Sequence, residues 1–225
     1  MRAATEVDVG LDARGRSVVR QMRCEAPLLV RVVDSESDVL RLVFVNGAAG
    51  PLGGDELRVR LSVEPRARVE VRSVAASLAQ PGAAGVPSTF DIDIEVGDDA
   101  TLDWSPQPTV SVSGSDHRTT VHLIATSTSH VRLHEAVVLG RYGEDSGRIA
   151  FRQRVVIDGR PVLDHETELG HSALMSPGAH GTGRHITSLL ELGSDLPPPS
   201  VHVSSTCIAA TMQISPRCSL TLRSA

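Results

Sequence analysis

The sequence predicts an all-β protein with at most two short helices, in which strands stack in a β-solenoid-like arrangement or a rolled sandwich. Three observations predict this fold class. Apolar and polar residues alternate along most segments, turn signals separate these segments, and a strand–turn–strand unit recurs along the chain. Alternation with period two places apolar side chains on one face of a strand, and recurrence of such a unit is typical of stacked layers.

The alternation is clearest in two segments near the middle of the chain. Residues 89–96 (TFDIDIEV) place Phe and Ile on one face and acids on the other, and residues 57–63 (LRVRLSV) alternate in the same way. Both patterns predict half-buried strands. A hairpin follows later, because Asp158-Gly159 separates two further strand-like segments, residues 152–157 and 160–163.

One segment allows either type of structure. Val71, Val74, Ala75 and Leu78 would share one face of a helix that ends before Gln80-Pro81-Gly82, but the segment is short and also fits a strand. It is the main reason to allow for a short helix.

The recurring unit has three copies, which begin at Val63, Val96 and Ala125. Residues 63–71 align with residues 96–104 and, more loosely, with residues 125–133. Each copy consists of a strand, a three-residue turn and a second strand. The repeat therefore predicts layers of strands stacked on one another.

Composition limits the function classes. The chain has 225 residues, 40% of them hydrophobic, and its net charge is −5, which fits one soluble domain over residues 1–225. All 22 basic residues are arginines and they are scattered, which argues against a nucleic-acid surface. Few aromatic residues argue against a sugar-binding cleft. No stretch of about 18 apolar residues occurs, and the start lacks a signal core, so we expect a cytoplasmic protein with no membrane contact.

Three cysteines without a Cys-x-x-Cys pair, Cys24, Cys207 and Cys218, favour free thiols in a reducing compartment. The glycine-rich residues 47–57 (GAAGPLGGDEL) do not predict a nucleotide site. They lack the lysine, the hydroxyl and the following helix of a phosphate loop, and they end in two acids. We expect this loop to turn the chain into a strand, and we expect no affinity for GTP or ATP.

Several polar residues are candidates for chemistry. The histidine pairs His130 with His134 and His165 with His171 lack the spacing of a zinc site and favour solvated strand positions. Asp164, Glu166 and Glu168 alternate on one face of a strand. This row fits a solvated face, a row of carboxylates along a channel, or a carboxylate pair of a hydrolase.

Two other segments stand out. Residues 103–110 (DWSPQPTV) put the single tryptophan beside two prolines that interrupt a strand, which predicts a rigid exposed corner. Residues 135–144 (EAVVLGRYGE) run from an apolar strand into a glycine-containing loop with one arginine and one acid. Each of these segments also fits an ordinary edge or turn.

Taken in order along the chain, these segments resemble the signatures of the urease accessory protein family UreD, also called UreH. The resemblance rests on Gly53-Gly54-Asp55, on residues 104–110, on residues 135–144 and on Arg152-Gln153-Arg154, and it extends from about residue 16 to residue 169. Residues 170–225 match poorly. The chain also departs from many relatives at residues 71–79, where a threonine-rich stretch is absent.

The resemblance implies a non-enzymatic, mostly β scaffold that docks on urease apoprotein and recruits UreF and, through UreF, the GTPase UreG. It implies no tightly bound cofactor and nickel in transit through a water-filled passage. A passage needs ligands that hold nickel briefly, for which sparse carboxylates suit better than a closed histidine or cysteine cage. The candidate nickel-path residues are Glu135, Glu144, Glu166, Glu168, Asp55 and Asp103. The candidate partner contacts are Trp104, Pro106, Gln107, Pro108 and Arg141. The alternative is a β-solenoid hydrolase or lyase that uses carboxylate pairs.

Overall fold

The computed structural model describes residues 1–33, 38–83, 85–170, 183–194, 196–204 and 207–225. These residues form eighteen β-strands and no helix, which confirms the all-β prediction. The segment that allowed either type of structure is extended, since β6 (Arg68–Ser73) ends there and β7 (Ser77–Ala79) begins. The described part of the chain therefore contains no helix that could span a lipid bilayer.

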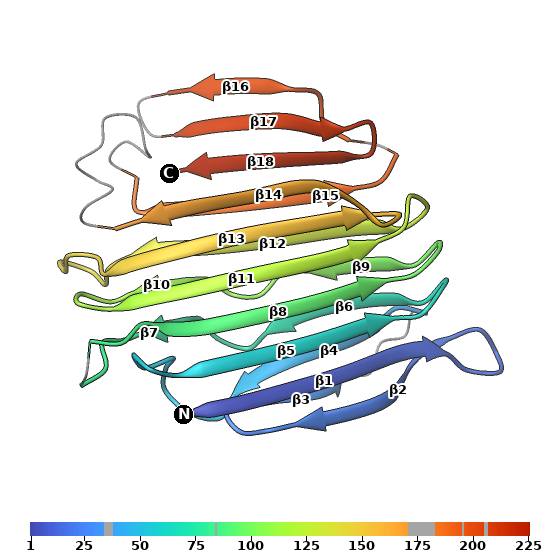
Figure 1. Cartoon of the computed structure of the whole chain (residues 1–225), viewed down its shortest axis with the longest axis horizontal. Coiled ribbons are helices and arrows are strands. Elements are labelled where there is room, and N and C mark those ends of the chain that lie inside the picture. Colours follow the sequence, from blue (N-terminus) through green and yellow to red (C-terminus); the bar gives the residue numbers. More distant parts are fainter. Residues whose placement is uncertain (34–37, 84, 171–182, 195, 205–206) are drawn as a thin grey trace.

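The strands form two sheets that face each other (Figure 1). The seven-stranded sheet has the order β14 (Arg160–Leu169), β13 (Arg148–Ile157), β11 (Asp116–Ala125), β8 (Ser88–Val96), β5 (Glu56–Val63), β1 (Arg2–Leu11) and β2 (Ser17–Cys24).

The eleven-stranded sheet has a longer main path. Its order is β16 (Ser200–Val203), β17 (Ile208–Ser215), β18 (Cys218–Ser224), β15 (His185–Leu192), β12 (His130–Leu139), β9 (Thr101–Trp104), β6, β4 (Leu40–Asn46) and β3 (Leu28–Val33). Off this path, β10 (Thr109–Ser111) pairs with β12 and with β7.

The middle of the chain coils between the two sheets. It passes from β5 to β6, from β8 to β9 and from β11 to β12, so that successive strands of each sheet are parallel neighbours. Antiparallel hairpins close both ends of the coil, β1–β2 with β3–β4 at one end and β13–β14 at the other. The predicted stacking is confirmed, and the fold resembles a β-solenoid.

The three copies of the repeat are the three turns that carry the chain from one sheet to the other. Their corners stack, because the N–H of Thr101 donates to the carbonyl of Ala67 at 2.9 Å and the N–H of His130 donates to that of Ala100 at 2.9 Å. Ala67 and Ala100 are fully buried, so a small side chain is needed at these inner corners. The copies align because each corner must fit on the next.

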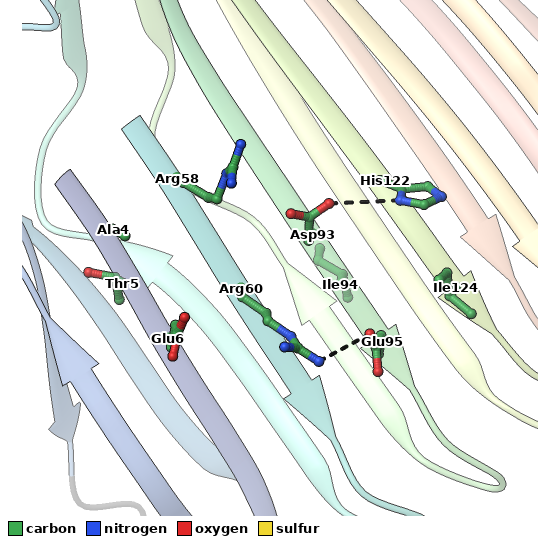
Figure 2. Close-up of a pocket in the computed structure, with 10 residues that line it drawn as sticks. All are labelled: Ala4, Thr5, Glu6, Arg58, Arg60, Asp93, Ile94, Glu95, His122 and Ile124. Carbon is green, nitrogen blue, oxygen red and sulfur yellow. Dashed lines mark hydrogen bonds and ion pairs between the residues drawn. The ribbon is translucent and has the colours of Figure 1, made fainter. Parts of the chain in front are cut away.

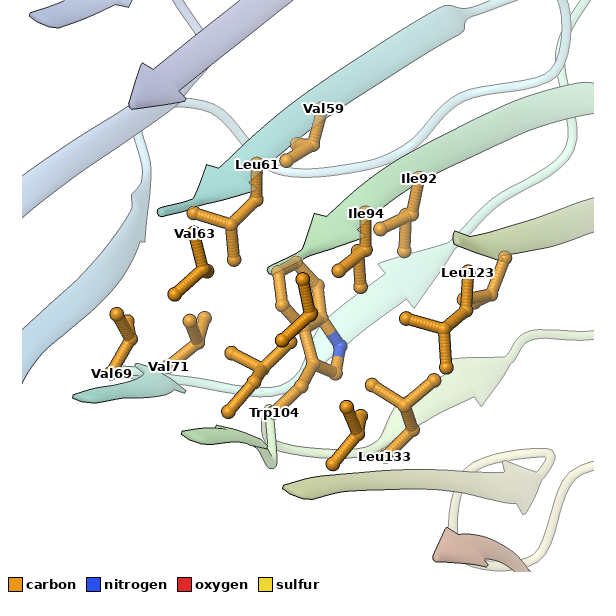
Figure 3. Close-up of a cluster of buried hydrophobic side chains, with 14 of the residues drawn as sticks. Val59, Leu61, Val63, Val69, Val71, Ile92, Ile94, Trp104, Leu123 and Leu133 are labelled. Carbon is orange, nitrogen blue, oxygen red and sulfur yellow. The ribbon is translucent and has the colours of Figure 1, made fainter. Parts of the chain in front are cut away.

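Alternating residues of both sheets meet in one large apolar cluster (Figure 3). Leu61 and Ile94 come from the seven-stranded sheet, and Val71, Trp104 and Leu133 come from the other sheet. The predicted strands at residues 57–63 and 89–96 contribute their alternate residues to this cluster, as their patterns require. Burial of these side chains is the main stabilising term, about 1.5–3 kcal/mol for each large aliphatic residue.

Candidate functional site

A layer of polar side chains crosses the interior between the sheets and separates the large apolar cluster from a smaller one. Along β12 the inward-facing residues change from Leu133, in the large cluster, to Glu135 and then to Val137 and Leu139, in the small cluster. On β15 the inward-facing residues change in the same way, from Leu190 to Ser188 and then to Ile186. The polar layer consists of His117, Thr119, Glu135, Gln153, His165, Thr167 and Ser188.

Glu135 is the interior carboxylate of this layer. It accepts a hydrogen bond from the indole N–H of Trp104 at 3.2 Å, and it faces a cavity of about 50 Å³ that is also lined by Thr119, Pro106 and Gln107. Loss of bulk water raises the pKa of the Glu135 carboxyl to about 7, although the hydrogen bond from Trp104 opposes the shift. Near neutral pH this group can therefore both hold and release a proton.

A second cavity of about 30 Å³ adjoins the first, and Asp55 and His117 are among its lining residues. The two cavities share five lining residues, which are Leu28, Asn46, Ser77, Phe90 and Thr109. One water molecule needs about 10–15 Å³ of such volume, so both spaces have room for water. Polar groups therefore follow one another from Asp55 to Glu135 through the gap between the sheets.

His117 lines the second cavity and is hydrogen-bonded to Thr119, which lines the first. Its Nδ1 lies 2.8 Å from the hydroxyl of Ser88, and its Nε2 lies 3.1 Å from that of Thr119, which lines the Glu135 cavity. Burial lowers the pKa of His117 to about 4, so the ring is neutral at physiological pH. A neutral imidazole held by two hydroxyls can exchange hydrogen-bond partners without carrying charge.

Asp55 holds the turn of the glycine-rich loop. It is 6% exposed, accepts the backbone N–H of Leu52 at 2.9 Å and pairs with the Met1 ammonium group at 2.7 Å. The loop passes close to a second turn, because a Cβ atom on Gly53 would lie 2.4 Å from the nitrogen of Gly82. The loop therefore has a structural role, and Asp55 both caps the turn and lines the second cavity.

Glu144 lies outside the interior, in the loop between β12 and β13. It accepts hydrogen bonds from the Arg141 guanidinium at 2.8 and 3.0 Å, and these bonds lower the pKa of Glu144 to about 2. Arg184 donates to the backbone carbonyls of Leu139 and Glu144. The Arg141–Glu144 pair thus holds the loop shape and gives it an exposed charged surface.

Glu166 and Glu168 lie on the outer face of the seven-stranded sheet, not between the sheets. Arg148 binds Glu168 at 2.8 Å, and Arg152 binds Asp164 at 2.7 Å. These hydrogen bonds lower the pKa values of Glu168 and Asp164. The row of carboxylates fits the solvated face that the pattern allowed, and it does not face the two cavities.

The same outer face carries further pairs across the parallel strands. Figure 2 shows a shallow hollow there, in which Arg60 faces Glu95 at 3.4 Å and His122 faces Asp93 at 3.7 Å. Exposed pairs of this kind contribute about 0–1 kcal/mol each. We therefore interpret this hollow as a solvated polar surface.

The predicted exposed corner is only partly exposed. Gln107 is exposed, and Pro106 and Pro108 are half-buried. Trp104 is 2% exposed and packs against Phe44, with ring centroids 5.6 Å apart. The expectation that this tryptophan belongs to a surface corner is therefore wrong, because its side chain alternates inward with the rest of β9.

Asp103, one residue before the tryptophan, points to the opposite side. It lies on the outer face of the eleven-stranded sheet, where Arg72 binds it at 2.9 Å. Of the six candidate nickel-path residues, the structure therefore brings only Asp55 and Glu135 to the inter-sheet cavities. Within the described ranges, no group of three metal-binding side chains gathers in one place.

His117, Thr119, Gln153 and Ser188 were not among the sequence candidates. The alternation of the sequence could have identified them, because each is a polar residue at a position that the alternation turns inward. Ser188 donates to the Gln153 side chain at 3.3 Å. The buried Nε2 of Gln153 has no protein partner in the described chain. His171, the second member of a histidine pair considered above, lies outside the described residues.

Comparisons with known proteins identify a family. A family model described as UreD urease accessory protein matches residues 2–222, so the match continues beyond residue 169, where the motifs alone matched poorly. The chain is 38% identical over 181 residues to the urease accessory protein UreD of Streptomyces coelicolor, which covers 80% of this chain and 69% of that protein.

Two further relatives carry the same name. The protein of Parafrankia sp. is 36% identical over 177 residues, which is 79% of this chain and 60% of that relative. The protein of Frankia alni is 32% identical over 226 residues, which is 84% of this chain and 76% of that relative. The chain thus spans about 60% of the length of the Parafrankia relative.

Proposed function

The chain belongs to the UreD urease accessory protein family, and on this premise we propose that it is a non-enzymatic scaffold for urease maturation. In this proposal it docks on urease apoprotein in the cytoplasm. With UreF, and with the GTPase UreG bound through UreF, it guides nickel into the urease active site. Nickel is cargo in transit, and the chain itself holds no tightly bound cofactor.

The observation that carries the proposal is the polar layer between the sheets, with Glu135 beside a water-sized cavity. An ion in transit needs oxygen or nitrogen ligands that bind weakly and are few in number. Glu135 and Asp55 offer carboxylates, and His117 and Thr119 lie between them along the adjoining cavities. The route from Asp55 to Glu135 is our proposed nickel path.

The pKa of Glu135 gives the path a release mechanism. Because burial raises this pKa to about 7, proton and metal compete for the carboxylate near neutral pH. Entry of a cation displaces the proton, and reprotonation favours release of the cation. A carboxylate with an ordinary pKa would lack this competition at neutral pH.

Nucleotide chemistry would belong to the partner. The glycine-rich loop packs against a neighbouring turn and lacks the features of a phosphate loop. No specific observation favours the alternative of a carboxylate-dependent hydrolase, since the outer-face carboxylates Asp164 and Glu168 are bound by arginines.

The nickel-path proposal is tested by Glu135→Gln, with Glu166→Gln as the matched control. Both changes replace a carboxyl group by an amide of about the same size, but only Glu135 lies beside the cavity. Each variant is produced with the complete accessory set and urease apoprotein. Complex formation is checked by gel filtration, and nickel per urease active site is then measured. We expect at least about a 5-fold loss of nickel for Glu135→Gln, which corresponds to about 1 kcal/mol, and no loss for Glu166→Gln.

Full nickel loading by Glu135→Gln would refute the path between the sheets. Loss of nickel in Glu166→Gln would instead place the path along the carboxylate row of β14. Loss of assembly in either variant would assign that residue to an interface.

Partner docking is tested at Gln107. Its side chain is exposed, and its backbone N–H donates to the hydroxyl of Ser73 at 2.9 Å, which holds the corner in one shape. A pre-shaped turn loses little entropy on binding. We expect Gln107→Arg to weaken assembly with UreF or urease apoprotein while changing the unfolding free energy by no more than about 0.5 kcal/mol. Unchanged assembly, measured by gel filtration of the mixed proteins, would show that the corner is only structural.

A further inference from the structure

Among the strands that the structure describes, β16 is the edge strand of the eleven-stranded sheet, and no described strand pairs with its outer side. In Figure 1, β16 and β17 lie beyond β14, the last strand of the seven-stranded sheet. Four large apolar side chains are exposed there, with Val201 at 77%, Val203 at 68%, Met212 at 42% and Ile208 at 40%. Exposed apolar residues gathered in one place often mark an interaction surface.

These four side chains continue the core face of the sheet. Val201 lies opposite Ala210 and Val203 lies opposite Ile208. On the next strand pair, Met212 lies opposite Leu220, which is fully buried in the core. Residues that face each other across antiparallel strands share one face. The apolar face of the sheet therefore extends past the point where the opposing sheet ends.

The backbone of β16 also has N–H and C=O groups that no described strand uses. The N–H of Ser204 donates to the carbonyl of Cys207 at 2.8 Å, which makes this a hydrogen-bonded pair. Because hydrogen-bonded and non-hydrogen-bonded pairs alternate along antiparallel strands, the N–H and C=O groups of Val203 and Val201 point away from β17. Both residues therefore present a donor and an acceptor at the open edge.

This edge differs from the other sheet edges in charge. The edge strand β14 carries Asp164, Glu166 and Glu168, and the edge strands β2 and β3 carry arginines. Charged residues on edge strands oppose pairing with another copy of the same edge. The strand β16 (SVHV) contains no Asp, Glu or Arg, so like charges do not prevent it from pairing with itself.

We propose that β16 is the contact of a two-fold homodimer, in which a second copy of this chain pairs antiparallel with it about His202. In this register Val201 faces Val203 of the second copy on the apolar face, and His202 faces His202 of the second copy on the other face. The outward groups of Val201 and Val203 then form four hydrogen bonds. The inference goes beyond the proposed function and stands without it.

The other registers that keep the two apolar faces together are poorer. A dyad at Val201 would place Val203 opposite Pro199, which has no N–H to donate. A dyad at Val203 would place Val201 opposite residue 205, beyond the end of β16. A contact through one strand of four residues is short, so we expect a concentration-dependent dimer.

The test is sedimentation velocity of the full chain from about 1 to about 200 μM, a range that covers weak dimers. We expect a monomer–dimer equilibrium at the monomer mass of 23.9 kDa and at twice that mass. His202→Glu and His202→Arg should each raise Kd at least about 10-fold, because like charges would face each other at the dyad. An equimolar mixture of the two variants should recover the dimer, since opposite charges then face each other.

Two further variants separate pairing from folding. Gln213→Glu adds the same charge on the same face of β17, away from the open edge, and should leave Kd unchanged. Val203→Pro removes an outward N–H that β17 does not use, and should abolish the dimer while circular dichroism stays unchanged. A monomer throughout the concentration range, or a dimer that neither His202 substitution weakens, would overturn the proposal.

Discussion

Replacing Glu135 by glutamine should change how the stability of this protein depends on pH. The wild-type carboxyl has a pKa of about 7 in the folded protein, against 4.5 for the ordinary group. The folded state therefore binds this proton more tightly than the unfolded state does. Stability that comes from the protonated group is present below pH 4.5 and is lost as the pH rises through 7.

The size of this effect follows from the shift in pKa. One unit corresponds to about 1.4 kcal/mol, so ionising Glu135 costs the wild-type protein about 3 kcal/mol above pH 7. Glutamine is close in size, stays neutral and can still accept the indole N–H of Trp104. At pH 4 the two proteins should differ little, and at pH 8 the variant should be more stable by about 3 kcal/mol.

Equilibrium urea unfolding at a series of pH values measures this difference. Because both proteins share every other titrating group, their other contributions cancel when the unfolding free energies are subtracted. Trp104 provides a second, local measurement, since it is the single tryptophan and donates directly to Glu135. Its fluorescence should titrate with a midpoint near 7 in the wild type and not in the variant. A difference in free energy that is independent of pH would refute the assignment of Glu135 to a position shielded from bulk water.

Two further predictions concern the same polar layer. Trp104→Phe removes the hydrogen bond that lowers the pKa of Glu135, so this pKa should rise above about 7. The unfolding free energy should fall by about 1–3 kcal/mol. If the pH dependence of urea unfolding shows no rise in the pKa, the prediction is wrong. His117→Gln should remove an acid-dependent loss of stability. The pKa of His117 is about 4 in the folded protein, against 6.5 for the ordinary group. The stability that depends on the neutral ring is therefore present above pH 6.5, and about 3 kcal/mol of it is lost as the pH falls to 4. Equal acid sensitivity of variant and wild type would contradict this prediction.

The sequence alone determined the fold class. Period-two alternation at residues 57–63 and 89–96 places the same residues inward in the structure, because a strand has only two faces. The repeat at Val63, Val96 and Ala125 determined the stacking, because each turn between the sheets must pack on the next turn. The hairpin at Asp158-Gly159 is also confirmed, and both residues have the positive φ angles, 48° and 72°, that such a turn requires.

Only the tertiary structure decided which carboxylates lie inside. Glu135 and Glu166 both stand on alternating strands, but Glu135 lies on the inward phase of its strand and Glu166 on the outward phase of a row bound by arginines. Phase within one strand can be read from its apolar neighbours, whereas the partner across the sheet cannot, because it is distant in sequence. Trp104 shows the same limit: its prolines suggested a surface corner, but the packing of Phe44 and Glu135 against it holds the indole in the core. Alternation fixes two faces for each strand, and only the stacking of many strands decides which polar residues meet across the gap.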